Sequence, residues 1–304
     1  MRIVVLAGGS GGAMLAEGLD AVLPAGELTV IANTGDDVVL WGLHVSPDVD
    51  AVLYRLAGIF NEVSHWGIAE ETFASLEMLR RLGEETWFGL GDRDLATHIL
   101  RSEWMRSGMT LTEATAEIGR RLGVATAVIP MSDEPVRTFI DTVSKGRLSL
   151  QEYFVREGTE PEVAAVMIEN AGAPPSPAAV AALESADLVV IGPSNPVVSI
   201  DPILSILGDR LDPARTVAVT PIVAGAALKG PTLKMLTSLG RDATPVGLAT
   251  YYARWAGTFV LDARDSDQRS AIEALGAKVH VLDTVMAGAH GCARLARELL
   301  GALA

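Results

Sequence analysis

Four aspartates stand in two short groups, Asp36-Asp37 and Asp48-Val-Asp50, and carboxylates grouped in this way can hold a divalent cation. Pro47 suits the first turn of a helix, so Asp48 and Asp50 are expected in that turn, where acids also stabilise the helix dipole. With a phosphate nearby, magnesium between it and these acids would offset their charge. A carboxylate that does not bind the metal could act as a general base. The group therefore predicts metal-assisted chemistry on a phosphate compound.

A glycine-rich turn precedes these acids and is the first candidate for binding phosphate. It follows the apolar run Ile3–Ala7 and consists of Gly8, Gly9, Ser10, Gly11 and Gly12. Its spacing fits neither common nucleotide motif, because Met14 replaces the last glycine or alanine of a dinucleotide fingerprint and a P-loop would need a later glycine and a lysine. Free backbone N–H groups at a helix start still favour an anion. A glycine turn that serves only packing is the alternative.

Three further segments carry polar groups next to predicted strands or helix starts. Ser194 and Asn195 lie between two prolines, where Asn could present a donor and acceptors to a nucleobase, or the segment could be a bare turn. A second segment gathers Asp92, Arg93, Asp94 and His98 around a helix start, which ion pairs alone would explain. The third follows a strand and contains Ser132, Asp133 and Arg137. Arg137 could bind phosphate or form a structural ion pair.

Seven apolar, Val/Ile-rich runs of strand length must position these residues. They are continuous, as expected for strands buried on both faces of a parallel sheet: Ile3–Ala7, Leu28–Asn33, Thr126–Ile129, Asp187–Ile191, Val217–Thr220, Thr258–Leu261 and Val279–Leu282. Helical patterns separate many of them, including Pro177–Ser185, Asp201–Gly208, Ser266–Leu275 and Ala289–Leu303. The sequence predicts one α/β domain with a doubly wound, mostly parallel, Rossmann-like sheet. Loops after the first two strands would then meet at the carboxyl edge and bring the glycine turn to the acids.

A mainly helical insertion is predicted at about 58–123, where helical patterns cover Glu70–Leu82, Leu95–Arg106 and Leu111–Leu122. Four of the five tryptophans fall in or just before this segment: Trp41, Trp66, Trp87 and Trp104. They could form the core of a helical subdomain or line a pocket for an aromatic ligand.

Composition excludes several classes of protein. The 304 residues carry a net charge of −14 without a basic run, which argues against a nucleic-acid partner. The single cysteine, Cys292, excludes an intramolecular disulfide and a Cys-based zinc site. Neither a signal peptide nor an apolar run long enough to span a membrane is evident. We expect a cytoplasmic protein without a membrane partner.

Taken in order, the motifs resemble the 2-phospho-L-lactate transferase family of coenzyme F-420 biosynthesis. The resemblance runs nearly end to end and rests on GGSGGAML, NTGDD, GLHVSPDVDAVLY, HWG, WFGLGDRDLATH, PMSDEPVRT, QEYFV, IGPSNPVVSI, TPIVAGAALKGP and LDTVM. It implies magnesium-dependent transfer of a phospholactyl-type group from a guanosine diphosphate conjugate to the ribityl hydroxyl of the deazaflavin Fo. GMP would be released, and a homodimer would be usual.

The resemblance also implies roles for individual residues. Asp37 and Asp50 would be first for magnesium and for activating the hydroxyl, followed by Asp36 and Asp48. The turn Gly8–Gly12 would touch phosphate, and Ser194 and Asn195 would hold guanosine. The deazaflavin would lie near Trp41, His65, Trp66 and Trp87, with Asp92, Arg93 and His98 at the polar rim.

The chain departs from the family at Met14, where many relatives have Lys or Arg. A cation at this position is therefore lost, and we expect Arg93, Arg137 and the metal to contact the phosphate in its place. The donor stays open between phospholactyl, phosphoenolpyruvyl and phosphoglyceryl forms.

Two other classes of protein are weaker alternatives. A related family of sugar-nucleotide-binding regulators, the gluconeogenesis factors, typically lacks the SPDxDxxLY helix entry that this chain has. An NAD oxidoreductase would need an acid at the end of the second strand, where Asn33 stands.

Overall fold

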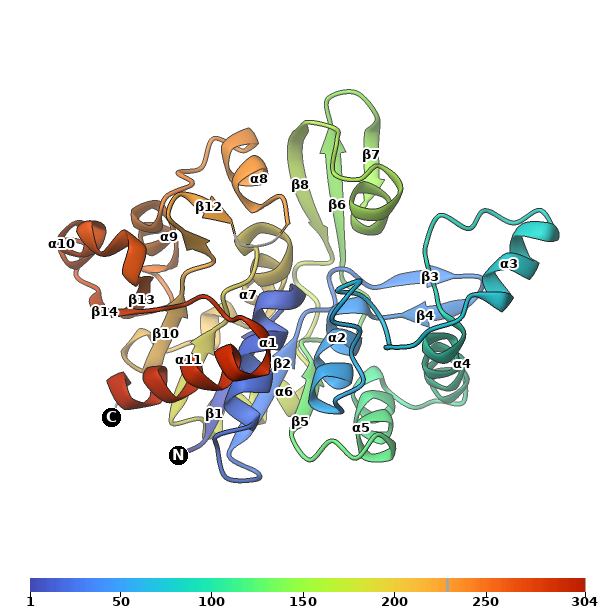
Figure 1. The fold of residues 1–304 in the computed structure, drawn as a ribbon, viewed down its shortest axis with the longest axis horizontal. Coiled ribbons are helices and arrows are strands. Elements are labelled where there is room, and N and C mark those ends of the chain that lie inside the picture. Colours follow the sequence, from blue (N-terminus) through green and yellow to red (C-terminus); the bar gives the residue numbers. More distant parts are fainter. Residues whose placement is uncertain (228–229, 304) are drawn as a thin grey trace.

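A parallel sheet of seven strands forms the centre of the computed structural model, which describes residues 1–227 and 230–303 (Figure 1). From one edge to the other its strands are β14 (Lys278–Leu282), β13 (Thr258–Asp262), β10 (Thr216–Val219), β9 (Leu188–Ile191), β1 (Ile3–Ala7), β2 (Leu28–Ala32) and β5 (Ala127–Pro130). These are the seven runs that the sequence predicts as strands, and every neighbouring pair is parallel. The predicted fold class is confirmed.

Helices cover both faces of the sheet. Their bounds are α1 (Gly9–Asp20), α2 (Pro47–Leu56), α3 (Ala74–Arg81), α4 (Asp92–Arg106), α5 (Leu111–Arg121), α6 (Pro177–Ser185), α7 (Asp201–Leu207), α8 (Thr232–Ser238), α9 (Pro245–Tyr252), α10 (Arg269–Glu273) and α11 (Gly288–Leu303). Two short π-helical turns, η1 (Glu152–Arg156) and η2 (Pro196–Ile200), and three 3-10 turns, η3 (Gly208–Arg210), η4 (Pro213–Arg215) and η5 (Ala263–Gln268), complete the set. The predicted helix at Ser266–Leu275 is divided between η5 and α10.

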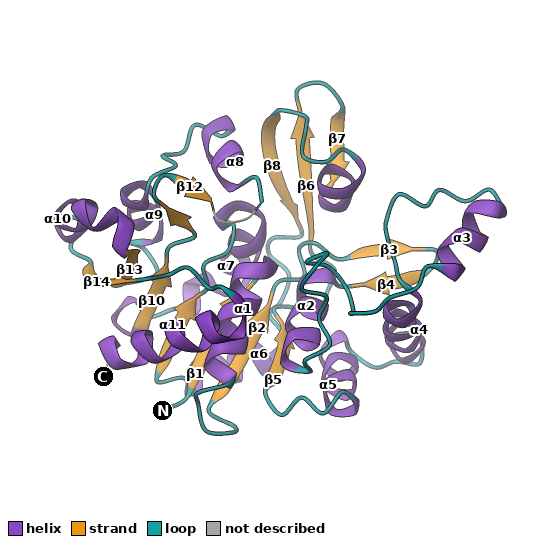
Figure 2. Cartoon of the chain, viewed as in Figure 1, coloured by secondary structure: helices purple, strands orange, loops and turns teal. Residues whose placement is uncertain are grey.

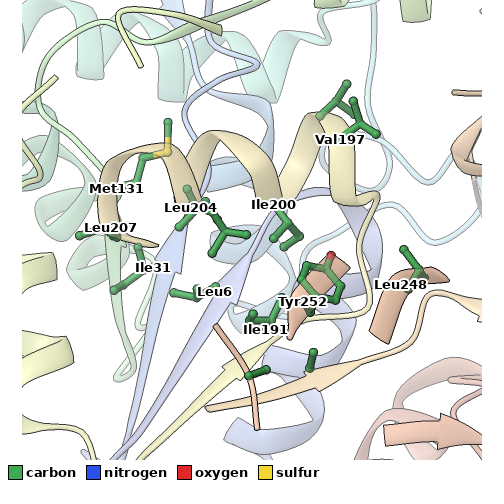
Figure 3. Packing of buried hydrophobic residues seen from close by; sticks show 14 of the residues in the cluster. Leu6, Ile31, Met131, Ile191, Val197, Ile200, Leu204, Leu207, Leu248 and Tyr252 are labelled. Carbon is green, nitrogen blue, oxygen red and sulfur yellow. The ribbon is translucent and has the colours of Figure 1, made fainter. Parts of the chain in front are cut away.

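Alternate residues of each strand enter two separate cores, because successive side chains of a strand point to opposite faces. On one face Leu6, Ile31 and Ile191 pack against residues of η2, α7 and α9 such as Ile200 and Tyr252 (Figure 3). The other face contributes Val5, Val30 and Val190 to a core shared with α1, α2, α5 and α11. Burial on both faces explains why the strands read as continuous apolar runs.

The chain order makes a switch point between β1 and β9. From β1 the chain continues outward through β2 to β5, and from β9 it continues outward the opposite way through β10, β13 and β14. At the carboxyl edge, the loops that follow β1 and β9 therefore lead to helices on opposite faces of the sheet. Open α/β sheets bind ligands in the crevice at such a point.

Antiparallel pieces, coloured as strands in Figure 2, lie outside the main sheet. They are the hairpin of β3 (Val38–Leu40) and β4 (Leu43–Val45), the sheet of β6 (Arg137–Thr142), β7 (Gly146–Ser149) and β8 (Val163–Glu169), and the pair β11 (Ile222–Val223) and β12 (Ala226–Ala227). Residues 58–123 carry α3, α4, α5 and one isolated bridge between Phe60 and Ile68. In Figure 1 the hairpin, α3 and α4 project away from the main sheet.

Candidate active site

The glycine turn lies against the loop that follows β9. The Gly12 N–H donates to Ser194 Oγ over 2.8 Å. A Cβ atom on Gly11 would lie 2.0 Å from the Pro193 carbonyl oxygen, so only glycine permits this approach. Gly9 begins α1 with a φ of +62°, again a glycine conformation. Packing thus accounts for part of the glycine pattern, while Gly9, Ser10 and Gly11 also face open space.

Two cavities border the N-terminus of α1. The first, which we call the acidic cavity, has a volume of about 310 Å³, and its polar lining includes Gly9, Ser10, Asp36, Asp48, Asp50, Asp94, His98 and Gln151. The second, the methionine cavity, also has about 310 Å³ and is lined by Met14, Met286, Ser194, Asn195, Thr232 and Thr284, among others. Gly9, Ser10, Phe154, Val198 and Ser199 line both cavities. The start of α1 is therefore a shared wall.

Asp36 is the least satisfied carboxylate of the acidic cavity. Its side chain is buried, and Oδ1 has no hydrogen-bond partner in the described part of the chain. Burial raises the pKa of Asp36 well above its usual value, and the nearby Asp48 and Asp37 raise it further. A cation at this position would remove both penalties.

Asp48 links the glycine turn to β2. Its Oδ1 accepts the Gly9 N–H over 2.6 Å, and its Oδ2 accepts Asn33 Nδ2 over 2.8 Å. Burial raises the pKa of Asp48 to about 6 despite these two hydrogen bonds, which lower it. This carboxylate can therefore take up a proton near neutral pH.

Asp50, predicted as a metal ligand and an activator of the hydroxyl, is engaged by an arginine instead. Arg101 on α4 is fully buried and donates to both oxygens of Asp50, including the 2.9 Å contact from Nη1 to Oδ2. Burial lowers the pKa of Arg101, but the charge and hydrogen bonds of Asp50 outweigh it and raise the pKa. Both oxygens of Asp50 are thus paired, and its role as a metal ligand stays a prediction.

Asp37, also predicted beside the metal, has a partner for each of its oxygens. One oxygen lies 2.8 Å from His44 Nε2 and the other accepts the hydroxyl of Ser46, which fastens the β3–β4 hairpin to the start of α2. Asp37 lines neighbouring cavities along β3 and not the acidic cavity. Among the described residues, no group of three or more His, Cys, Asp or Glu side chains is arranged to hold a metal by itself.

His98 lies between two carboxylates beneath the acidic cavity. Its Nε2 is 3.1 Å from Asp94 Oδ1, and its Nδ1 is 3.7 Å from Asp50 Oδ2. The Tyr54 hydroxyl donates to the same Asp94 oxygen over 2.6 Å. These contacts join α4 to α2 along the floor of the cavity. The predicted rim position of His98 is thus a buried one.

The predicted aromatic residues divide into two groups. His65 and Trp66 line the acidic cavity, and Trp66 meets Phe88 edge-on at 5.3 Å. Trp41 and Trp87 instead pack against a small separate core formed by Val45, Phe88 and Leu90. Trp87 also lies under the guanidinium of Arg156 at 4.6 Å. The hairpin β3–β4, α3 and α4, with their connecting loops, form a projecting arm. Packing within this arm explains the positions of Trp41 and Trp87.

Four other predicted site residues lie outside the lining of both cavities. Asp92 accepts N–H groups of Ala74 and Ser75 at the start of α3, and hydrogen bonds from Thr72 and Ser75 lower its pKa. Arg93 is exposed and donates to the Ala69 carbonyl. Ser132 donates to the Pro174 carbonyl, and Arg137 is exposed beside β3.

Ser194, Asn195 and Met14 line the methionine cavity, although each also has internal contacts. Asn195 Oδ1 accepts the Val197 N–H at the start of η2, and its Nδ2 faces the sulfur of Met235 at 3.4 Å. A thioether is a weak acceptor, so that N–H would gain from a better partner. Lys229, within the segment TPIVAGAALKGP, lies outside the described residues.

The sequence patterns predict no site role for four residues that line the acidic cavity or contact its lining: Asn33, Tyr54, Arg101 and Gln151. Asn33 argues against an NAD site in the sequence, and in the structure it orients Asp48. Arg101 follows His98 by three residues on α4, and this helical spacing is the one signal that could have drawn attention to it.

Comparisons with known proteins indicate one family over nearly the whole chain. Residues 3–300 match the family model described as 2-phospho-L-lactate transferase CofD. A 2-phospho-L-lactate transferase of Methanosarcina acetivorans is 38% identical, with 98% of each chain covered. A phosphoenolpyruvate transferase of Streptomyces griseus is also 38% identical, covering 99% of this chain and 98% of the relative. A crystal structure of a UPF0052 family member from Bacillus halodurans has a TM-score of 0.64 over 98% of both chains, with 16% identity, and shares the fold.

Proposed function

Because the chain belongs to the 2-phospho-L-lactate transferase family, we propose that it catalyses the corresponding step of coenzyme F-420 biosynthesis. A phospholactyl-type group leaves its guanosine diphosphate conjugate and is joined to the ribityl hydroxyl of the deazaflavin Fo. The group is 2-phospho-L-lactate, phosphoenolpyruvate or 3-phosphoglycerate. A new bond forms between the hydroxyl oxygen and phosphorus, the bond to GMP breaks, and F-420-0 or dehydro-F-420-0 results.

One observation carries this proposal: two cavities of similar volume share the N-terminus of α1 as a common wall. A transfer between two large molecules needs a pocket for each and a phosphate position where they meet. The helix start offers backbone N–H groups and the positive end of a helix dipole, which both favour a phosphate.

The acidic cavity suits the deazaflavin acceptor. Phe60, Tyr54 and Trp66 supply the apolar and aromatic surface that a planar ring system needs, and Trp66 is 36% exposed at its opening. The hydroxyl chain would extend toward Asp36 and Asp48, where the reaction takes place.

The methionine cavity suits the guanosine end of the donor. Met14 and Met286 offer soft, adaptable surfaces for a flat base, and Asn195 has an N–H directed at a sulfur that a carbonyl oxygen would replace. Ser194 fixes the glycine turn between the base and the reacting phosphate.

Magnesium fits a site at Asp36, which leaves Asp48 to act as the base. Magnesium is commonly held by one or two carboxylates together with substrate phosphates and waters, so Asp36 and the donor phosphates can form the site. Asp36 Oδ1 is a buried oxygen without a partner, which a cation would satisfy. When bound, magnesium supplies charge stabilisation for the phosphoryl oxygens in the transition state.

The chain's own residues position the substrates and remove the proton. Asp48, whose pKa is about 6, lies next to the Gly9 N–H at the phosphate position and accepts the proton of the attacking hydroxyl. Arg101 fixes Asp50 and with it the first turn of α2, which carries Asp48. Trp66 and Phe154 cover the cavities and limit access of water.

The decisive experiment combines the protein with Fo, magnesium and each of the three guanylated donors, followed by mass spectrometry of the product. We expect GMP and one phosphodiester product whose mass identifies the donor. Asp209→Asn serves as an active control, because the Asp209 side chain is 89% exposed and pairs with Arg254 on the surface. Absence of a phosphodiester with all three donors would contradict the proposal and favour a binding protein.

A further inference from the structure

The short turn after β13 contacts two chain segments that line the methionine cavity. Thr284, Val285 and Met286 follow β14 and form one segment, and Pro221 belongs to the other, which follows β10. Asp262 ends β13 and Asp265 lies in η5, and neither lines the cavity. Both carboxylates nevertheless contact these segments.

Asp262 holds the segment after β14. Its Oδ2 accepts both the N–H and the hydroxyl of Thr284, each over 2.8 Å, and its Oδ1 accepts the Arg264 N–H over 2.8 Å. The side chain is completely buried. Burial alone would raise the pKa of Asp262, but the hydrogen bonds from Arg264 and Thr284 outweigh it and lower the pKa. The carboxylate is thus ionised, and both of its oxygens accept hydrogen bonds.

Asp265 holds the segment after β10. Its Oδ2 accepts the Ala224 N–H over 2.8 Å, and its side chain is 5% exposed. Ala224 has a φ of +50°, a conformation that a residue with a Cβ atom adopts only when neighbouring contacts impose it. This hydrogen bond fixes the backbone three residues after Pro221.

Arg294 on α11 gives the segment after β14 a second attachment. Its guanidinium donates to the Val285 carbonyl over 2.9 Å and lies 3.2 Å from Asp283. Arg264 reaches the same Asp283 from the opposite side, over 3.0 Å. The segment is therefore held by charged groups from β13, η5 and α11.

We propose that Asp262 and Asp265 are positioning residues of the donor site, which set the width of the methionine cavity and so the affinity for the guanosine diphosphate part. The inference rests on the proposed function, since it assumes that the nucleotide occupies this cavity. It adds that affinity for the nucleotide depends on side chains that never touch it.

Asp262→Asn tests this role. The Arg264 guanidinium also donates to Asp262, over 3.1 Å, so the carboxylate accepts from two groups of Thr284 and two of Arg264, and an amide must turn its NH2 toward one of these residues. We expect the Kd for GDP and the KM for the donor to rise about tenfold, corresponding to about 1.4 kcal/mol. The Kd for Fo and kcat should stay within about twofold, as for a loss of uniform binding. Calorimetry with GDP and with Fo, together with steady-state kinetics, provides these values.

Two further variants make the test decisive. Arg294→Gln removes the surface attachment of Val285 and should weaken GDP binding in the same direction even if Asp262→Asn fails to fold. Asp212→Asn is the matched control. Asp212 caps η4 through the Ala214 N–H over 2.9 Å, and η4 directly precedes β10, so it lies at the amino end of the strand and not at the carboxyl edge. It should bind GDP as the wild type does.

The outcomes separate this inference from the proposed function. A wild-type protein that binds no GDP contradicts both. Normal GDP affinity in folded Asp262→Asn, or in Arg294→Gln when the first variant does not fold, overturns the inference and leaves the proposed function standing. An equal loss of affinity for GDP and Fo would indicate general damage and would also overturn the positioning role.

Discussion

At the scale of single residues, Asp36 and Asp37 are neighbours in sequence with opposite surroundings. Asp36 has a buried oxygen without a partner beside the glycine turn, whereas both oxygens of Asp37 are held by His44 and Ser46. A buried carboxylate in this state costs free energy unless a ligand satisfies it. We therefore propose that Asp36 holds the metal during the reaction and that Asp37 only fastens the hairpin to α2.

Asp36→Asn should lower kcat/KM for Fo by at least about 100-fold, because it removes a charge that the metal and the transition state need. Asp37→Asn, the matched control, should stay within about tenfold of the wild type. Initial rates of GMP release measure both. Similar losses in the two variants would contradict the separate roles.

Asp48 makes stability depend on pH. Its pKa rises from 3.8 to about 6 on folding, so the folded state binds more protons than the unfolded state between these values. The free energy of unfolding without divalent cations should fall by about 3 kcal/mol as pH rises through this window. Asp36, whose pKa is also raised, adds to this fall. Urea titrations from pH 4 to pH 8 measure the slope.

Asp48→Asn should flatten this slope, and magnesium should stabilise the wild type more as pH rises, because it binds the ionised carboxylates. A slope that persists unchanged in the variant would show that other groups cause it.

Some residues of the site could be predicted from the sequence, and others could not. The acids and the glycine turn stand directly after strands, and parallel topology alone brings such loops together. The partner of Asp50 is 51 residues away on α4, and its helical spacing from His98 is the one local signal that distinguishes Arg101 from the other arginines. Likewise, the direction in which Asp36 and Asp37 point depends on the hairpin that follows them.

At the scale of elements, α4 holds α2 in place through buried contacts. Arg101 pairs with Asp50, and Asp94 accepts a hydrogen bond from the Tyr54 hydroxyl. Through these contacts α4, in the projecting arm, sets the position of α2, which lines the acidic cavity. Removal of one partner from a buried ion pair leaves an uncompensated charge.

Arg101→Met should therefore lower the free energy of unfolding by about 3 to 5 kcal/mol and reduce transfer activity through displacement of α2. Arg106→Met on the same helix is the control, since its side chain is 63% exposed and it should cost less than about 1 kcal/mol. Chemical denaturation gives both values. Equal stability of the two variants would rule out a supporting role for the buried pair.

The seven strands of the main sheet could be predicted because burial on both faces makes each a continuous apolar run. The antiparallel strands escaped because their faces differ: β6 alternates buried and less buried residues, and β3 has three residues without a fully buried one. Such short, half-exposed strands are specified by their partners more than by their own composition. The apolar pattern accordingly predicts no strand at the hairpin or at the β6–β8 sheet.

At the scale of the whole molecule, the two cavities meet at one helix start and can be filled together. Both substrates should then be bound before any bond breaks, which predicts sequential kinetics. Double-reciprocal plots of initial rate against donor concentration at several Fo concentrations should intersect. Parallel lines, or release of GMP in the absence of Fo, would instead indicate a covalent enzyme intermediate.

The contact between Gly12 and Ser194 spans 182 residues. During synthesis on the ribosome, the glycine turn therefore leaves the exit tunnel long before the loop that completes it. Until then the nascent chain has β1, β2, β5 and most of the lining of the acidic cavity, but it lacks most of the lining of the methionine cavity. The same dependence means that a fragment ending before β9 would keep every acidic residue of the site and still lack the pocket for the donor.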